Sequence, residues 1–157
     1  MKLWGIIGSI LLSVVLLPAQ ASAGPLEEAT AMVKEGKSLL AKAKRARKSK
    51  RKELLIRGAG KYARAYLILT TGKAPEGSES LLAEVKANVA ELSARPDLVA
   101  AREATRVKAI KAAAEGRLTD AYDLFARMRD MDPRDQSIEY ILGVIGQRMD
   151  AGRENAQ

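Results

Sequence analysis

The 157-residue chain contains no histidine and no cysteine, and aromatic residues make up only 4% of it. The lack of imidazoles and thiols excludes a Ser-His-Asp triad, a cysteine nucleophile and the usual zinc ligands. No pair of carboxylates stands out as a catalytic dyad either. We therefore expect a protein that is not an enzyme, with no catalytic residues, no metal site and no cofactor.

The scarcity of aromatic residues also predicts a core of aliphatic side chains and alanine, which suits closely packed helices. β-Branched residues never gather in alternating runs, so the sequence predicts no strand. Apolar residues instead recur at three- and four-residue steps. The predicted fold class is all-α, a short irregular stack of antiparallel helical hairpins with about six helices. The ranges expected to be helical are 26–46, 53–71, 78–94, 96–115, 118–131 and 135–149.

Turn and cap residues mark several of these boundaries. Pro96 suits the first position of a helix, and Gly116 interrupts the helical pattern. Asp132 and Pro133 end the fifth helix, and Asp135 is placed to cap the sixth. These signals predict sharp boundaries in the second half of the chain.

An apolar segment typical of a signal peptide opens the chain. Residues 3–17 are mostly apolar, Pro18 ends the run, and Ala21 and Ala23 provide the small residues that a signal peptidase requires. We expect cleavage after Ala23, with a cut after Ala21 as the alternative, and export to the periplasm or the medium. A short uncleaved anchor is the other interpretation of this segment. After cleavage we expect no transmembrane span.

The chain is divided by these patterns into four parts. Residues 1–23 form the signal peptide, and residues 24–58 form an N-terminal helix with a basic linker. Residues 59–150 form a helical domain, and residues 151–157 form a polar tail.

Two stretches that begin with glycine echo each other. Residues 60–69 and 116–125 share Gly, Ala and Tyr at the same offsets. Each stretch predicts a helix that starts after a tight turn at its glycine, which suggests one packing solution used twice.

The second stretch continues into a longer pattern. Ala121, Phe125 and Pro133 are followed by Leu142 and Gly143. This spacing resembles the tetratricopeptide repeat, whose unit is a pair of helices. In that family Ala-x3-Phe lies in the second helix of a repeat, Pro follows that helix, and Leu-Gly lies in the first helix of the next repeat. The resemblance covers residues 102–149. The residues expected to pack the repeat are Gly116, Leu118, Ala121, Phe125, Pro133, Leu142 and Gly143.

The match is partial. Glu139 stands where the family has Trp, Gly146 stands where it has an aromatic residue, and Lys108 stands at the upstream Leu position. The two echoing glycines are 56 residues apart, whereas regular repeats of about 34 residues would place them 34 or 68 apart. We therefore expect an irregular stack, and a fragment 102–157 that folds poorly alone.

The resemblance implies a scaffold that holds another protein or a peptide in a concave groove lined by first helices. When the positions that line the groove in the family are transferred to this chain, the lining residues are Glu103, Arg106, Ile110, Ala113, Ser137, Tyr140, Val144 and Gln147. From these we expect partner contacts at Arg106, Ile110, Tyr140, Val144 and Gln147. A homo-oligomer is also compatible with this interpretation.

A dense run of basic residues lies between 42 and 57, where nine Lys and Arg residues face one carboxylate, Glu53. One interpretation is a docking patch for anionic lipid or acidic polysaccharide of the cell envelope. The other is a solvated connection between helices. No aromatic residue interrupts the run, so we expect no nucleic-acid partner. The candidate anion-binding residues are Lys42, Lys44, Arg45, Arg47, Lys48, Lys50, Arg51 and Lys52.

Overall fold

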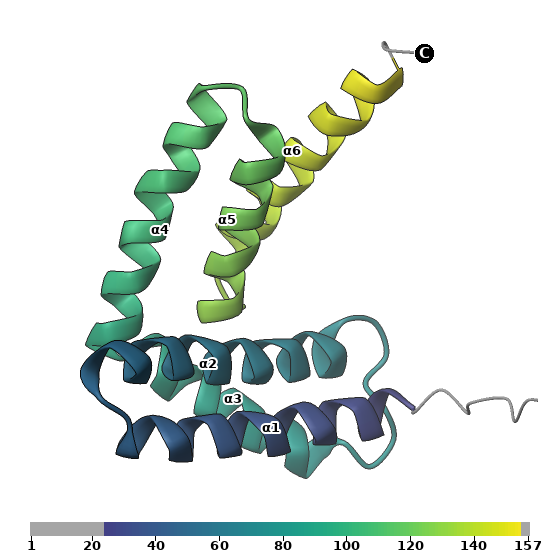
Figure 1. Cartoon of the computed structure of the whole chain (residues 1–157). Helices are drawn as coiled ribbons and strands as arrows, with labels where there is room; N and C mark the ends of the chain where they lie inside the picture. Colours follow the sequence, from purple (N-terminus) through teal and green to yellow (C-terminus); the bar gives the residue numbers. More distant parts are fainter. Residues whose placement is uncertain (1–23, 155–157) are drawn as a thin grey trace, which may run out of the picture.

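The computed structural model describes residues 24–154, and the predicted signal peptide lies outside the described residues. The described part contains six α-helices and no strand, which confirms the all-α prediction (Figure 1). The helices are α1 Pro25–Arg45, α2 Lys48–Thr70, α3 Glu79–Ser93, α4 Pro96–Ala114, α5 Leu118–Met131 and α6 Gln136–Glu154.

Most predicted boundaries agree with these helices, but α2 begins five residues before its predicted start. Lys and Arg are good helix formers, so the basic segment ahead of Leu54 continues the helix instead of forming a linker. Only Ala46 and Arg47 separate α1 from α2. The predicted boundary between residues 58 and 59 therefore falls inside one helix. At the other end, α6 extends to Glu154, into the range predicted to be a polar tail.

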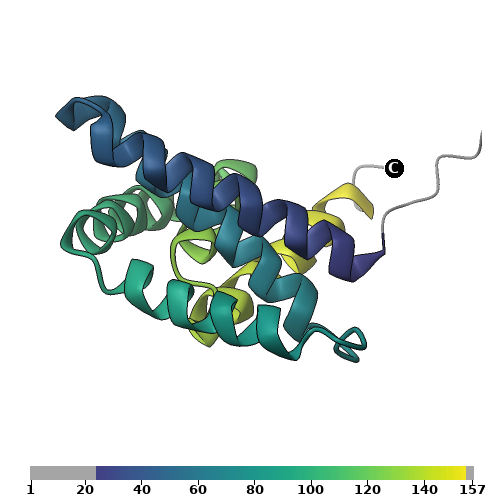
Figure 2. The same cartoon turned by 90° about the horizontal axis from the view of Figure 1, so that it is seen from below.

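The helices form two groups of three that meet at a steep angle (Figures 1 and 2). Helices α1, α2 and α3 form a block, and α4, α5 and α6 form an arm that rises from it. α2 is the central element, because it packs against α1 and α3 in its own block and against α4 and α5 in the arm. Its buried residues accordingly lie on more than one side of the helix.

The α1–α2 contact is closest at two glycines. A Cβ atom on Gly36 would lie 2.9 Å from the Tyr62 ring, and a Cβ on Gly58 would lie 2.8 Å from Leu40. Each such Cβ would also lie near the carbonyl oxygen of the opposite glycine, at 3.4 and 3.6 Å. The two backbones therefore approach at a distance that a side chain at either position would oppose.

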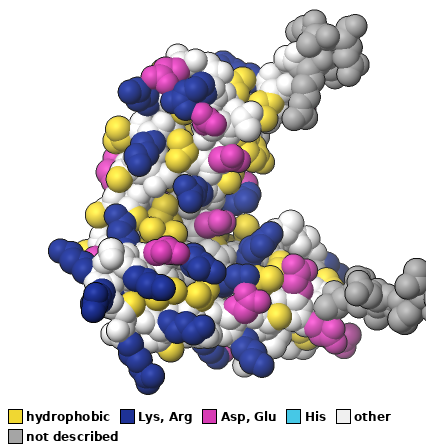
Figure 3. Space-filling view, viewed as in Figure 1, with side chains coloured by type: hydrophobic (Ala, Val, Ile, Leu, Met, Phe, Trp, Pro, Cys, Tyr) yellow, Lys and Arg dark blue, Asp and Glu magenta, His cyan; other side chains and the backbone are white. Residues whose placement is uncertain are grey.

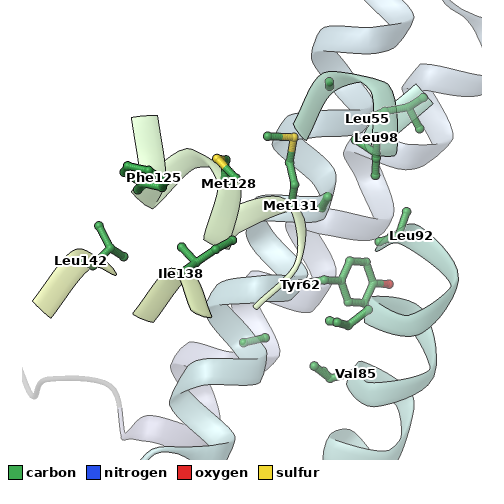
Figure 4. Close-up of a cluster of buried hydrophobic side chains, with 14 of the residues drawn as sticks. Leu55, Tyr62, Val85, Leu92, Leu98, Phe125, Met128, Met131, Ile138 and Leu142 are labelled. Atoms are coloured by element: carbon green, nitrogen blue, oxygen red, sulfur yellow. The ribbon is translucent and has the colours of Figure 1, made fainter. Parts of the chain in front are cut away.

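The core is built mainly of aliphatic side chains, with Tyr62 and Phe125 as its buried aromatic members. Figure 4 shows Tyr62 between α2 and α3, whereas Phe125 and Met128 lie with Ile138 in the arm. Met131 lies between these two groups, so one continuous apolar cluster joins the block to the arm. This composition agrees with the prediction of an aliphatic core.

The turn at Gly116 is the sharp break that the sequence predicts. Gly116 has a φ of 74°, a left-handed conformation in which a side chain is strained. The N–H of Arg117 donates to the carbonyl of Ala112, and the N–H of Gly116 donates to that of Ala113. These two bonds form a Schellman motif, which satisfies the last carbonyls of α4.

Gly60, by contrast, does not begin a helix, and that prediction is wrong. Gly60 lies in the middle of α2, where the Cβ of Asp130 lies 3.6 Å from a Cβ placed on the glycine. A Cβ at this distance makes an ordinary van der Waals contact, so the packing of α5 on α2 does not require a glycine here. The two similar stretches therefore place their glycines in different settings.

A chain of polar contacts fastens the arm to the block. Arg102 of α4 donates to Asp132 at the end of α5, with 2.8 Å between Nη1 and Oδ2. Asp132 also pairs with Arg134 at 3.2 Å, and Arg134 donates to the buried hydroxyl of Ser93 at the end of α3. The acidic turn between α5 and α6 thus joins three elements, and Asp135 caps α6 by accepting from the backbone N–H of Ser137.

Candidate functional site

A small groove lies across the arm, on the side formed by α4 and α6. Its volume is about 190 Å³. It is lined by Arg106, Ile110, Phe125, Met128, Ser137, Ile138 and Ile141. The structure thus brings together Arg106 and Ile110 of the predicted partner-binding set, with Ser137 of the predicted groove lining.

The large exposed apolar side chains of the described residues gather on the two helices that border this groove. Ile110 is 57% exposed and Val107 is 63% exposed on α4, and Tyr140 is 75% exposed on α6. Val99, nearer the start of α4, is also exposed. Single exposed apolar residues are ordinary, but the placement of all four on the two helices that flank this groove is typical of a contact surface.

The remaining predicted lining residues are less uniform. Gln147 is exposed, and Val144 and Ala113 are half-buried. Glu103 is exposed and lies 3.7 Å from Arg106 as an ion pair along α4. The sequence did not identify Phe125 and Met128 of α5 as groove residues. Their spacing indicates only that they pack in the core, and it does not show that part of the side chain also borders a groove.

The residues predicted to pack the repeat are mostly buried. Ala121 is fully buried, Phe125, Pro133 and Leu142 are buried, and Leu118 is half-buried. Gly143 is different, because it is exposed and a Cβ there would meet nothing within 4 Å. The structure gives Gly143 no packing role, since no further helix of the described chain lies against that side of α6.

The basic residues gather at the end of the molecule where α1 passes into α2 (Figure 3). The basic cluster comprises Lys42, Lys44, Arg45, Arg47, Lys48, Lys50, Arg51 and Lys52, all of them exposed. Within residues 24–154, none of the eight forms an ion pair. The sequence is interpreted as a basic linker with these eight charges along it. In the structure, a short turn between two antiparallel helices brings the eight charges together.

The helix dipoles stabilise the α1 half of the basic cluster and destabilise the α2 half. The last turn of α1 holds Lys42, Lys44 and Arg45, and cations there are favourable because the carbonyl end of a helix is negative. The first turn of α2 contains no acidic residue and begins with Lys48 and Lys50 at the positive end of the helix. The α2 half of the cluster is therefore held at some electrostatic cost to the fold.

A second, mostly basic hollow lies where the end of α5 meets α2, with a volume of about 480 Å³. Arg57, Lys61 and Arg64 of α2 line it together with Arg127 and Arg129 of α5. Figure 3 shows how the surface is hollowed between the block and the arm.

Asp130 is the one carboxylate that lines this hollow within the described residues. Burial raises the pKa of its carboxyl group above the ordinary value, and the positive charges of Arg129 and Arg64 oppose that shift. Lys61 is engaged by Glu35 of α1, with 2.5 Å between Nζ and Oε2.

Two other kinds of site are absent from the described residues. No group of three or more Asp, Glu, His or Cys side chains is placed to hold a metal ion in that part of the chain. None of its helices combines the length and the apolar character needed to cross a membrane.

Comparison with known proteins does not assign the chain to a family. No protein-family model, no curated protein and no solved structure matches this chain.

Proposed function

We propose that this chain is an exported, non-enzymatic scaffold that binds another protein or a peptide through the α4–α6 side of its arm. The observation that carries the proposal is the exposure of Val107, Ile110 and Tyr140 on the two helices that flank a largely apolar groove, which Ile110 itself lines. Phe125 and Met128 supply the floor of that groove, so an apolar side chain of a partner could be buried there. The tetratricopeptide-like spacing supports the same use of these helices.

The open side of α6 is a further support. Among the described helices, α6 packs mainly on α5. Tyr140 on this helix is 75% exposed and so is free to contact a partner. Tyrosine is enriched at protein interfaces because it combines a large apolar ring with a hydroxyl that can stay in contact with water.

The proposal is tested with the mature protein as bait in an envelope fraction. A protein that co-purifies is identified by mass spectrometry, expressed alone and titrated against the wild type and Tyr140→Ala. We expect this substitution to weaken binding by about tenfold or more, since a tyrosine that becomes buried in an interface is often a dominant contact. Lys86→Gln, at an exposed position of α3 and so outside α4 and α6, is the control variant and should bind like the wild type. Equal binding by all three proteins would contradict the proposal.

The export part of the proposal rests on residues 1–23 alone. N-terminal sequencing of protein recovered from its own cells tests it, and the expected first residue is Gly24. Recovery of a chain that begins at Met1 would contradict cleavage.

The basic cluster favours a second candidate function, attachment to an anionic envelope surface such as anionic lipid or acidic polysaccharide. The supporting observation is that the cluster places cations in the first turn of α2, where they oppose the helix dipole. A solvating role alone gives no reason for that arrangement, whereas an anion would be attracted both by the charges and by the helix end.

Sedimentation with lipid vesicles separates the two functions. We expect binding to phosphatidylglycerol vesicles and not to phosphatidylcholine vesicles, with a steep decline between low and physiological salt. Replacing the eight cluster residues by Gln should abolish this binding and leave a protein partner bound to the α4–α6 side. Undiminished binding by the Gln variant would rule out attachment through the basic cluster.

A further inference from the structure

A pocket in the N-terminal block is separate from the groove of the arm and borders the basic cluster, with which it shares Lys44 and Arg51. It lies among α1, α2 and α3 and has a volume of about 440 Å³, within the range of pockets that hold small molecules. Leu40, Leu55 and Leu92, one from each helix, form an apolar part of its lining. Figure 4 shows Leu92 near the ring of Tyr62, which also lines the pocket, whereas Leu55 lies farther along α2, beside Leu98.

Two polar groups at this pocket lack partners in the described structure. The Nε atom of Arg95 is buried and forms no hydrogen bond within residues 24–154. Tyr62 is only 1% exposed, and its hydroxyl likewise forms no hydrogen bond to another described residue. Figure 4 shows this hydroxyl directed from α2 toward α3. Both groups are donors. The Nε of Arg95 is the buried one of the two, and a buried donor without an acceptor is rare because it costs free energy.

The charges around the pocket are mostly positive. Lys44, Arg51 and Arg95 line it and form no ion pair within the described residues. Lys37 is already paired with Glu84, with 2.8 Å between Nζ and Oε1. Glu91 is the one carboxylate in the lining formed by residues 24–154. The pocket therefore combines a cationic rim, the buried and unpaired Nε donor of Arg95, the hydroxyl of Tyr62 and an aliphatic wall.

Burial raises the pKa of the Tyr62 phenol above its ordinary value, and the nearby charge of Glu84 acts in the same direction. The hydroxyl therefore keeps its proton at neutral pH and remains able to donate it in a hydrogen bond.

We propose that this pocket binds an amphipathic anion, a carboxylate carried on a medium-length acyl chain. The acyl chain lies against Leu40, Leu55 and Leu92. The carboxylate accepts hydrogen bonds from Arg95 and Tyr62 and is balanced by Lys44 and Arg51. A single dense polyanion fits less well, because the aliphatic wall would face it.

Calorimetric titration of the full mature protein with octanoate tests the proposal. We expect saturable binding at one site. Acetate, which has the head group alone, and octan-1-ol, which has the chain without the charge, should each bind about tenfold more weakly or not at all. Equal binding of octanol and octanoate would overturn the proposal, as would the absence of saturable octanoate binding.

Variants assign the binding to this pocket. Arg95→Gln should weaken octanoate binding by about tenfold, and Tyr62→Phe, which keeps the ring, by a few-fold. Lys86→Gln removes a charge from an exposed position on α3 outside the pocket and should bind like the wild type. Circular dichroism melts of each variant separate lost binding from lost folding. Folded Arg95→Gln protein that binds octanoate normally would overturn the assignment.

Competition identifies the source of the acyl anion. The competition uses a variant with Lys42, Lys48, Lys50 and Lys52 replaced by Gln, which weakens attachment through the basic cluster and keeps the pocket residues Lys44 and Arg51. Displacement of octanoate from this variant by phosphatidylglycerol vesicles, but not by phosphatidylcholine vesicles, would support the site and point to a membrane lipid. Octanoate binding that both vesicles leave unchanged would support the site and point to a free fatty acid.

Discussion

At the scale of single residues, Gly36 decides how closely α1 and α2 can pack. A Cβ at this position would lie 2.9 Å from two atoms of the Tyr62 ring, and that ring is buried and cannot move aside easily. At Gly58 the atom met first belongs to Leu40, a half-buried and flexible side chain. The restriction is therefore tighter at Gly36, although both positions have helical backbone.

Gly36→Ala should destabilise the protein by up to about 2 kcal/mol. Overpacking costs about 1–3 kcal/mol, and the higher helix propensity of alanine offsets about 1 kcal/mol of it. Gly143→Ala is the matched control, because a Cβ there meets nothing and the substitution should stabilise by up to about 1 kcal/mol. Urea unfolding followed by circular dichroism measures both. Equal stabilities of the two variants would show that the Tyr62 ring moves aside to make room for the added Cβ.

Asp130 should make stability depend on pH in a predictable direction. Burial raises the pKa of its carboxyl group in the folded state, so its contribution to stability is complete below the unfolded pKa and declines as pH rises through the folded pKa. Asp130→Asn should therefore be more stable than the wild type at pH 7. At about pH 3 the difference should vanish, because the carboxyl group is then protonated in both states. A difference that persists at acidic pH would contradict the stated cause.

At the scale of elements, α2 illustrates what the sequence could and could not predict. The bounds of α4 and α5 could be predicted because Pro96, Gly116 and Pro133 act locally on the backbone. The start of α2 could not, because Lys and Arg are good helix formers and no cap residue precedes them. The many buried positions of α2 also follow from neighbours far away in sequence, which no local spacing reveals.

The dipole argument for the basic cluster predicts a difference between two similar substitutions. Lys50→Gln in the first turn of α2 and Lys42→Gln in the last turn of α1 each relieve repulsion within the cluster. The α2 substitution also removes an unfavourable interaction with the helix dipole, whereas the α1 substitution removes a favourable one. Lys50→Gln should be the more stable by about 0.5–1 kcal/mol at low salt, as measured by urea unfolding. A difference that does not shrink in about 1 M salt would exclude this electrostatic origin.

The ion pair between Arg102 and Asp132 should contribute more than the other pairs. Its side chains are 21% and 15% exposed, so water screens the pair less than it screens Lys111 and Glu115 on the surface. A double-mutant cycle with Arg102→Ala and Asp132→Ala should give a coupling of about 1–2 kcal/mol. The same cycle at Lys111 and Glu115 should give less than about 0.5 kcal/mol. Similar couplings at both pairs would contradict the effect of burial.

At the scale of the whole molecule, the two groups of helices depend on each other. α5 packs on α2 as well as on its neighbours in the arm, so an isolated arm would expose Met131 and the rest of that face. The partner groove could be predicted in part, because Arg106, Ile110 and Ser137 follow from repeat offsets. The pocket of the block could not, since it depends on where α3 lies against α1 and α2.

The fragment 102–157 should therefore fold poorly, and so should the complete arm, residues 96–157. Each leaves the α2-facing side of α5 uncovered, and a small helical unit with an exposed apolar face loses much of its burial. Thermal unfolding followed by circular dichroism checks this, with the full mature chain as the control. A cooperative transition in either fragment would contradict it.

The position of α2 between the block and the arm has a consequence for hydrogen exchange. Because α2 packs against four other helices, its amides in the middle of the helix open only when both groups of helices separate. These amides should share the slowest exchange rates of the protein, with an opening free energy equal to that of global unfolding. α6, which packs mainly on α5, should exchange earlier. The order of exchange would then run inward from α6, through α5, to α2.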